Sequence, residues 1–236
     1  MEERSLFKRV KTSFLASAGD VVFGMEDGTV SIFGLVFGVA ATTSDRSTVL
    51  IAGASGAVAA AVSMMAGTYL DVETAGDEAR AAALSLDAEI DRNPGAVIER
   101  MAGRLRAADL APDKTQAVAE FLRSDRAILK GVASALAAPA EEGDDQGPLA
   151  QSLWMLLADF LAAAIPIVPF ALLSVGQGRI VSGAVTLLLL IGLGVGRARI
   201  GGRGVFRTVV ETVSIGVAAA LAGVAIGVAI ARAFGG

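Results

Sequence analysis

Residues 19–40, GDVVFGMEDGTVSIFGLVFGVA, are an apolar stretch of the length that one α-helix needs to cross a membrane, yet they contain three acidic side chains. Four further apolar stretches of near-spanning length follow along the chain. The five predicted spans are 20–42, 47–70, 150–174, 180–196 and 209–231. The fourth is short, and we expect flanking residues to complete it. This pattern predicts an all-α membrane protein with five transmembrane helices.

The composition agrees with a membrane protein and limits the possible chemistry. Of the 236 residues, 54% are hydrophobic and 19% are charged, and the mean hydropathy of +0.63 is too high for an ordinary soluble domain. The chain has no cysteine and no histidine, so any metal must be bound by carboxylates, carbonyls, hydroxyls or methionine sulfur. The sequence has no phosphate-binding loop, Ser-His-Asp set or metalloprotease motif. We therefore expect neither an enzyme nor a permanently bound cofactor.

A polar segment separates the second predicted span from the third and gives three regions: 1–70, 71–149 and 150–236. Within this segment apolar residues recur at helical spacing, and Asn93-Pro94-Gly95 and Ala111-Pro112-Asp113 are predicted to separate three helices. Residues 139–148, PAEEGDDQGP, are expected to be an acidic linker that returns the chain to the membrane. We interpret the segment as a three-helix cytoplasmic insertion between the second and third transmembrane helices.

The distribution of Lys and Arg predicts the orientation in the membrane. The N-terminal segment, the polar segment and residues 197–207 are rich in these residues, whereas the two loops between them hold only Arg46 and Arg179. Because loops rich in Lys and Arg stay in the cytoplasm, we expect five crossings from a cytoplasmic N-terminus to a C-terminus outside. The first 20 residues lack the apolar region and cleavage site of a secretory signal, so the first span is expected to be retained.

The acidic residues of the first span have two interpretations. Asp20 and Asp27 are seven residues apart and share one face of a helix, whereas Glu26 lies about 100° round the helix from Asp27. Asp20 and Glu26 are either solvated at the cytoplasmic edge of the membrane or part of an ion pathway. Asp27 lies deeper, where a charge is costly unless it faces water, an ion or a partner. We therefore favour a functional role for Asp27.

The later spans contain further candidate residues. Met64, Thr68 and Asp71 follow each other at helical spacing and form one stripe that can bind cations, although a methionine in a bilayer is often only a packing residue. A thioether beside carboxylates suits a borderline ion such as Fe²⁺, whereas carboxylates alone favour Mg²⁺ or Mn²⁺. Glu211 is expected either to pair with Arg207, one turn earlier, or to approach the pathway.

Small residues and prolines suggest how the spans pack. Gly24, Gly28, Gly34 and Gly38 give two patterns in which a small residue recurs after three others, which allows helices to approach closely. The third span contains Asp159 and the run AAAIPIVPFALL, whose two prolines must disturb the helical hydrogen bonds and predict a kink or a packing feature.

At these residues the sequence resembles the vacuolar iron transporter family, including its bacterial members. The resemblance rests on DVVFGMEDGTVSIFGLVFGVA (20–40) and AGASGAVAAAVSMMAGTYLDV (52–72), supported by IPIVPFALL (165–173) and ETVSIGVAAALAGVAIG (211–227). It extends over essentially the whole chain, including the polar insertion. The DG and SMxxGxYL motifs are its most specific parts.

The resemblance implies a homodimer of five-helix subunits that exchanges Fe²⁺ or Mn²⁺ for protons along the subunit interface. The family's DG aspartate corresponds to Asp27 and its SM methionine to Met64, and both are regarded in the family as pathway ligands. The helices between spans two and three form a cytoplasmic metal-binding domain in the family, with clustered glutamates and a methionine.

The chain departs from the family pattern in two places. Thr68 occupies the position of the usual glutamate before the tyrosine of the second motif, and Asp71, almost one turn later, is expected to compensate. The insertion holds few well-placed acidic candidates, and several arginines lie among them; the candidate ligands are Glu89, Glu99 and Glu120. Because a metal site needs several converging carboxylates, we expect weak metal binding by this domain and a main role as a folded cap or dimer contact.

The leading hypothesis is a transporter that exports Fe²⁺ or Mn²⁺ from the cytoplasm, coupled to proton entry. Asp27 is its predicted central ligand, Met64 its soft ligand, and Glu26, Thr68 and Asp71 line the cytoplasmic entrance. We expect metal ions, protons, lipid and a second copy of the chain as partners, no nucleic acid, and a location in a bacterial plasma membrane. The alternative is a non-transporting membrane scaffold or sensor whose polar domain binds a protein. An exporter of organic solutes is disfavoured because one Trp and one Tyr cannot line a roomy aromatic cavity.

Overall fold

The computed structural model describes residue 13 and residues 17–137 and 147–234, and in these residues it contains eight helices and no strand. The helices are α2 (Ala18–Thr42), α3 (Arg46–Arg92), α4 (Pro94–Ala107), α5 (Pro112–Ser124), α6 (Arg126–Ala137), α7 (Pro148–Leu172), α8 (Val175–Ile200) and α9 (Val205–Phe234). In the described part of the chain, five of them, α2, α3, α7, α8 and α9, are long and apolar enough to cross a membrane. The predicted all-α membrane fold with five spans is therefore confirmed.

The chain divides into two compact units, and the division falls inside α3. The first unit comprises Met1–Leu70 and Gln146–Gly236 and contains the five apolar helical segments; we call it the membrane unit. The second comprises Asp71–Asp145 and contains the polar end of α3 with α4, α5 and α6; we call it the polar unit.

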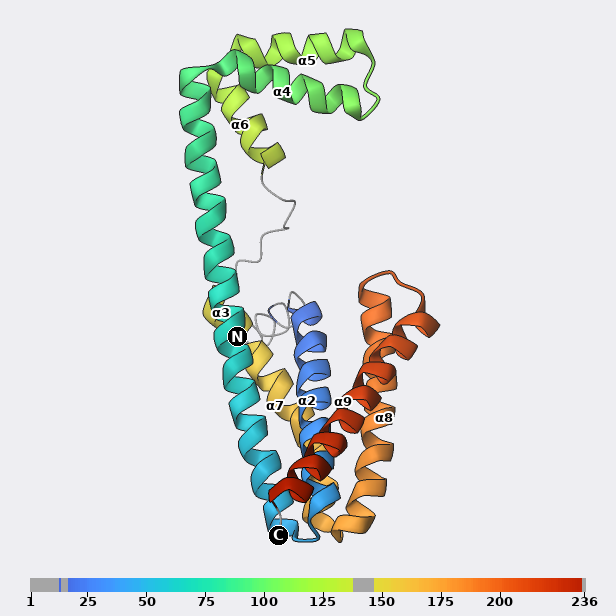
Figure 1. Cartoon of the computed structure of the whole chain (residues 1–236). Coiled ribbons are helices and arrows are strands. Elements are labelled where there is room, and N and C mark those ends of the chain that lie inside the picture. Colours follow the sequence, from blue (N-terminus) through green and yellow to red (C-terminus); the bar gives the residue numbers. More distant parts are fainter. Residues whose placement is uncertain (1–12, 14–16, 138–146, 235–236) are drawn as a thin grey trace, which may run out of the picture. The chain divides into compact units, whose positions relative to one another are not determined.

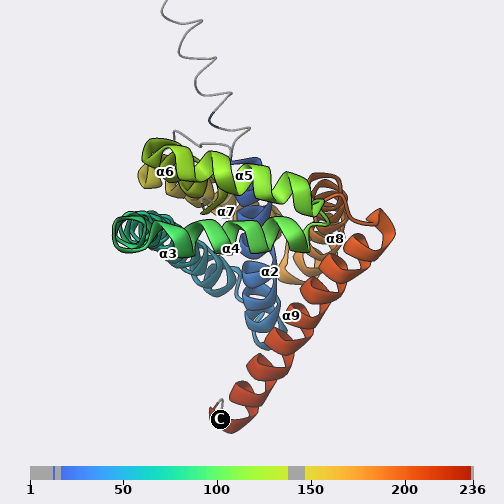
Figure 2. The same ribbon diagram turned by 90° about the horizontal axis from the view of Figure 1, so that it is seen from above.

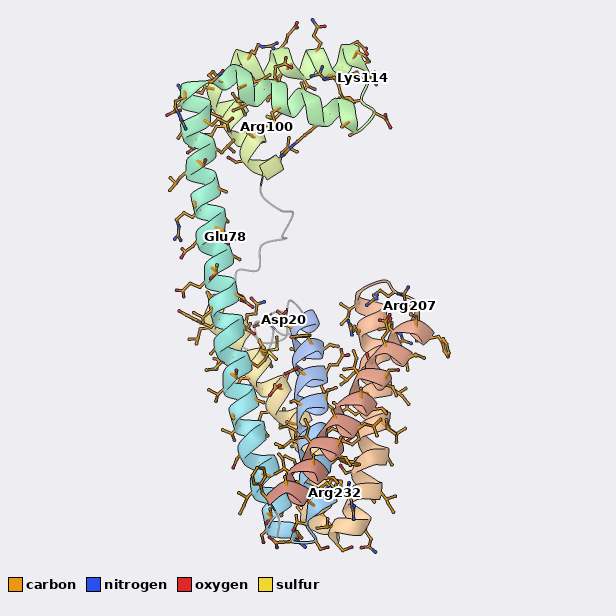
Figure 3. The ribbon with its side chains drawn as sticks, viewed as in Figure 1. Asp20, Glu78, Arg100, Lys114, Arg207 and Arg232 are labelled. Carbon is orange, nitrogen blue, oxygen red and sulfur yellow. The ribbon has the colours of Figure 1, made fainter. Side chains whose placement is uncertain are left out.

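In the membrane unit, α2 packs against α7, α8 and α9, and Figures 1 and 2 show it among these three helices. Residues of α2 and α7 meet in the same order along both helices, as Gly24 with Met155 and Gly28 with Asp159, so the two helices run parallel. The α7–α8 connection is only residues 173–174, and the α8–α9 connection is residues 201–204. Asp20 and Arg207 lie at one end of this unit and Arg232 at the other (Figure 3).

Glycines allow α2 and α9 to approach until their backbones touch. A Cβ atom added at Gly38 would lie 2.6 Å from the carbonyl oxygen of Gly223, and one added at Gly227 would lie 2.5 Å from the carbonyl oxygen of Gly38. Gly34 faces Ala219 in the same way, one turn earlier. Close backbone approach between small residues is a common source of stability in membrane helices, where burial of apolar surface contributes little. The small-residue pattern of α2 is thus a packing surface.

The prolines of α7 are accommodated inside a continuous helix. Both Pro166 and Pro169 lie within Pro148–Leu172 and are buried. The hydroxyl of Ser182 in α8 donates a hydrogen bond of 2.7 Å to the carbonyl oxygen of Pro166. A neighbouring helix therefore satisfies a backbone group in the proline segment, as expected for prolines in spanning helices. α8 itself begins five residues before the predicted span, because Ser174 caps it by accepting a hydrogen bond from the backbone N–H of Gln177 at 3.4 Å.

The polar unit contains three separate helices, α4, α5 and α6, but they are divided differently from the prediction. The first predicted helix is the continuation of α3, which ends at Arg92, where Asn93 caps α4 by accepting a hydrogen bond from Ala96 N–H at 3.1 Å. The third predicted helix is broken at Asp125 into α5 and α6. The Asp125 backbone is extended, and its carboxylate accepts a hydrogen bond from Ala127 N–H at 2.7 Å, which starts the new helix.

The polar unit has an apolar core of its own. Helices α4 and α5 lie side by side in Figure 2 and are in contact, and α6 packs against both. The core is built from Ile90, Val97, Ile98, Met101, Ala119, Leu122, Leu129 and Ala133. A separate core in the membrane unit gathers around Val36 and Phe170, both fully buried.

Candidate functional site

The acidic side chains of α2 point in two directions. Asp20 and Gly28 contact α7, whereas Glu26 contacts α8 and α9. Asp27 is seven residues, or two helical turns, after Asp20, which places it on the same side of α2 as Asp20 and therefore toward α7. The acidic side chains of α2 therefore face α7 on one side of the helix and α8 and α9 on the other.

Glu26 is part of a buried polar network. Its carboxylate lies 3.1 Å from the guanidinium of Arg197 in α8 and accepts a 2.8 Å hydrogen bond from the hydroxyl of Thr212 in α9. The Glu26 residue is only 8% exposed, so it is neither solvated nor snorkelling as one interpretation of the sequence had it. Next to it lies a cavity of about 220 Å³ lined by Gly19, Val22, Phe23, Glu26, Arg197, Ile200, Gly201 and Arg203. A paired and buried carboxylate of this kind ties three helices together.

Asp20 has a single polar partner on α7. The amide nitrogen of Gln151 donates a hydrogen bond of 2.5 Å to its carboxylate, and both side chains are half-buried. Together with Gly24 beside Met155 and Gly28 beside Asp159, this contact marks a row along the boundary of α2 and α7. We call this row the α2–α7 seam.

Asp159 lies in the seam, and it had been assigned no function from the sequence. It is completely buried, and neither carboxylate oxygen has a hydrogen-bond partner within the described residues. A Cβ atom added at Gly28 would lie 2.8 Å from its Oδ1, so the carboxylate lies directly against the backbone of α2. The signal was present in the sequence, because an aspartate inside a spanning helix is costly unless it has a function.

Asp27 and Asp159 are two carboxylates at the boundary of α2 and α7, and no basic side chain among the described residues pairs with either. Asp27 is half-buried and makes no hydrogen bond or ion pair with residues 17–137 and 147–234. Asp159 lies against the α2 backbone at Gly28, the residue after Asp27. Two acidic groups inside an apolar helix bundle favour a cation or protons in their neighbourhood. This is the strongest candidate for an ion-binding position in the chain.

The other predicted pathway ligands lie on α3, with Met64 and Thr68 in the membrane unit and Asp71 at the start of the polar unit. Met64 and Thr68 are half-buried, and Asp71 is exposed. In the described chain no hydrogen bond or ion pair joins Met64 or Thr68 to Asp27. Their role as ligands thus remains a prediction.

The glutamates of the polar unit are mostly held by basic side chains. Glu89 and Arg100 form a two-point ion pair with distances of 2.6 and 2.7 Å, and Glu99 lies 3.2 Å from Arg106. Glu120 accepts a hydrogen bond of 3.4 Å from the Gln116 amide. Further pairs join Lys130 to Asp87 and Arg126 to Asp91. Among the residues with described positions, no three His, Cys, Asp or Glu side chains cluster as a metal site would require.

Glu211 also has basic partners. Its carboxylate lies 3.0 Å from Arg207 and 3.3 Å from Arg203, which confirms the expected pairing with Arg207. Glu211 is therefore occupied at the α8–α9 turn and does not contribute to the seam.

The sequence of the five-span chain, including the acidic helix α2, matches a known protein family. The model of the VIT family matches residues 18–228. The chain belongs to the VIT family. Membership confirms the resemblance drawn from the DG and SMxxGxYL motifs, and the matched region contains the first four spans, the polar unit and most of the fifth span of this VIT protein.

Relatives of this VIT protein are found among plant proteins. It is 25% identical over 204 residues to "Vacuolar iron transporter 1" of Oryza sativa subsp. japonica, a match that covers 86% of this chain and 81% of the relative. It is 24% identical over 224 residues to "Vacuolar iron transporter 1" of Eucalyptus grandis, covering 94% and 90% of the two chains. The protein of the same name from Arabidopsis thaliana is 26% identical over 204 residues, covering 86% and 82%. The similarity thus extends over most of both chains.

Proposed function

We propose that this VIT protein is a divalent metal-ion transporter that exports Fe²⁺ or Mn²⁺ from the cytoplasm in exchange for protons. The observation that carries the proposal is Asp27, a carboxylate in the apolar helix α2 with no hydrogen bond or ion pair among the described residues, on the side of α2 that faces the buried Asp159. Family membership and the names of the plant relatives support iron as cargo. An unpaired intramembrane carboxylate binds cations or protons, and a transporter that exchanges them needs both abilities.

In this proposal Asp27 is the central ligand and a proton carrier, and Met64 supplies a soft sulfur ligand. The protein acts as a homodimer, in which each ligand is present twice around one ion. Thr68 and Asp71 line the cytoplasmic entrance. Glu26 belongs to this entrance only when its ion pair with Arg197 opens, because that pair occupies its carboxylate.

The proposed location is a bacterial plasma membrane, with the N-terminus and the polar unit in the cytoplasm and the C-terminus outside. Supporting this orientation, Arg207, in the arginine-rich segment 197–207, lies at the same end of the membrane unit as Asp20, and Arg232 lies at the opposite end (Figure 3). Positively charged turns stay on the cytoplasmic side.

The test is transport by the purified full-length protein in liposomes. Fe²⁺, Mn²⁺, Co²⁺ and Zn²⁺ are offered in turn across a pH gradient, and metal flux and proton flux are recorded together. We expect Asp27→Ala to abolish both fluxes. The matched control is Asp109→Asn, which removes one charge from an exposed turn residue with φ 59°, a backbone conformation that Asn tolerates. Undiminished metal-dependent flux in Asp27→Ala would overturn the proposal.

The alternative function is a non-transporting scaffold or sensor with a protein-binding polar unit. It draws support from the polar unit, where the described acidic candidates Glu89 and Glu99 are paired with arginines instead of being free for metal. Growth in excess metal separates the two functions. A transporter protects cells against iron or manganese when expressed and loses this protection with Asp27→Ala, whereas a scaffold gives no protection in either form.

A further inference from the structure

The α2–α7 seam carries oxygen and sulfur donors at successive turns of α7. Gln151, Met155 and Asp159 are spaced four residues apart, so their side chains lie on one face of the helix. They meet Asp20, Gly24 and Gly28 of α2 in that order. The seam runs inside one subunit, from half-buried Asp20 at the end of the helices to fully buried Asp159.

Packing does not explain why an aspartate occupies position 159. Removing a carboxylate from water costs several kcal/mol, and hydrogen bonds or a counter-charge normally compensate this cost. Asp159 has neither among the described residues, although its two oxygens are fully enclosed. An apolar side chain at this position would make the fold more stable. Because the buried Asp159 carboxylate lowers the stability of the fold, we infer that it is kept for a function, namely to bind a ligand.

The position of Asp159 relative to α2 indicates which ligand. Gly28 has no side chain, so nothing separates the Asp159 carboxylate from the α2 backbone. Asp27 lies two turns after Asp20, which contacts α7, and is therefore on the side of α2 that faces α7. Met155, one turn before Asp159 and 3% exposed, adds a thioether to the same face of α7. Carboxylates with a nearby thioether suit a borderline divalent ion such as Fe²⁺ or Mn²⁺ better than Mg²⁺ or Ca²⁺.

We propose that Asp159 is a second carboxylate ligand of the transported divalent cation, facing Asp27 across the α2–α7 seam. This inference rests on the proposed transport function and adds to it a ligand from α7 within the same subunit. The cation compensates the negative charge of both carboxylates, which explains how a completely buried aspartate with no hydrogen bond to the described residues is retained.

The test is Mn²⁺ binding to the purified full-length protein, measured by titration calorimetry and by the rise in Tm on adding MnCl₂. We expect Asp159→Asn to weaken Mn²⁺ binding by roughly tenfold to a hundredfold, since loss of even indirect partners of a metal ligand has an effect of this size. The Mn²⁺-dependent rise in Tm falls accordingly. The matched control is Thr186→Val, which removes a different buried polar group, a hydroxyl with no hydrogen-bond partner among the described residues, away from the seam, and leaves binding unchanged.

The Tm of Asp159→Asn in the absence of metal shows whether Asp159 acts as a metal ligand or as a structural residue. In chelator, Asp159→Asn is expected to match or exceed the Tm of the unmodified protein, because it removes an uncompensated buried carboxylate. A lower Tm in chelator together with weaker binding would assign Asp159 a structural role and overturn the inference.

Two further outcomes distinguish this inference from the proposed function. If the unmodified protein transports and binds Mn²⁺, and Asp159→Asn does so with the same affinity while Asp27→Asn does not, the inference fails and the proposed function stands. If the unmodified protein neither binds nor transports any of the four metals, both fail together.

Discussion

Glu26 and Arg197 form an ion pair with a distance of 3.1 Å between Oε1 and Nη1, although 171 residues separate them in the sequence. Thr212 completes the network, so one carboxylate of α2 is joined to α8 and α9. The adjacent residue, Asp27, has no such partner in the described chain. Of these two neighbouring acidic residues, Glu26 is paired and Asp27 has no partner in the described chain. Substitutions can test this difference.

Arg197→Gln is expected to destabilise the membrane unit by about 1–3 kcal/mol, because it leaves a buried carboxylate with one neutral partner. Thermal or denaturant unfolding in detergent measures the change. The double variant Glu26→Gln with Arg197→Gln is the control, and its loss should be smaller than the sum of the two single losses. Simple additivity would show that the pair contributes no coupling energy.

Gly38→Ala is expected to weaken the packing of α2 on α9. The new Cβ atom would lie 2.6 Å from the Gly223 carbonyl oxygen, which forces the backbones apart and costs about 1–3 kcal/mol. Gly192→Ala in α8 is the matched control, because a Cβ atom there meets nothing within 4 Å. In the same unfolding assay the control should be neutral or more stable, since alanine favours helix. Equal effects of the two substitutions would contradict backbone contact at Gly38.

The connection between α2 and α3 should respond to acid through Asp45. The Thr48 hydroxyl and the backbone N–H groups of Thr48 and Ser47 donate hydrogen bonds to this carboxylate, which hold its pKa below the ordinary value. A carboxylate with a lowered pKa stabilises the folded state at neutral pH, and this contribution is lost as the pH falls through the folded-state pKa, below about pH 4.

The measurement is thermal unfolding of the unmodified protein and of Asp45→Asn between about pH 6 and about pH 3. The unmodified protein should lose the larger share of its stability in this range. A second variant, Thr48→Val, should move the pKa of Asp45 back toward the ordinary value when it is followed by NMR. Identical pH profiles for the unmodified protein and Asp45→Asn would show that this cap makes no contribution.

The polar unit is expected to contribute little to metal transport. Replacing Glu89, Glu99 and Glu120 together by Gln should leave the Mn²⁺ flux in liposomes nearly unchanged, because Glu89 and Glu99 are already paired with arginines. Exposed pairs of this kind contribute little to stability, so the fold should tolerate the change. A large loss of flux with an unchanged Tm would instead identify these glutamates as metal ligands.

The five spans could be predicted from the sequence because length and apolarity alone decide whether a helix crosses a membrane. The break of the third predicted polar helix at Asp125 was missed, because Ser124-Asp125 lies inside an otherwise helical apolar pattern. Only the capping bond of the Asp125 carboxylate to Ala127 N–H shows where the second helix starts. In such cases a side-chain hydrogen bond to the backbone can end one helix and start the next, although the apolar residues keep their helical spacing.

The partners of the acidic residues could not be predicted in the same way. Periodicity places Glu26 and Asp27 on different faces of α2, but it does not state which helix covers each face. Arg197 was interpreted from the sequence only as a topological signal, and Asp159 only as a feature of a proline-containing span. Their contacts with α2 depend on how the helices pack, and this packing depends on glycines at particular turns.

The arrangement of charges in the membrane unit has a consequence for electroneutrality. Glu26 and Arg197 cancel each other, whereas Asp27 and Asp159 together carry two formal negative charges that no described basic side chain offsets. In the proposed homodimer two copies of this pair surround one divalent ion, and two protons carry the same charge as that ion. If the ion and the two protons occupy this place in turn, the bundle has the same net charge in both states, and a membrane voltage does not favour either of them.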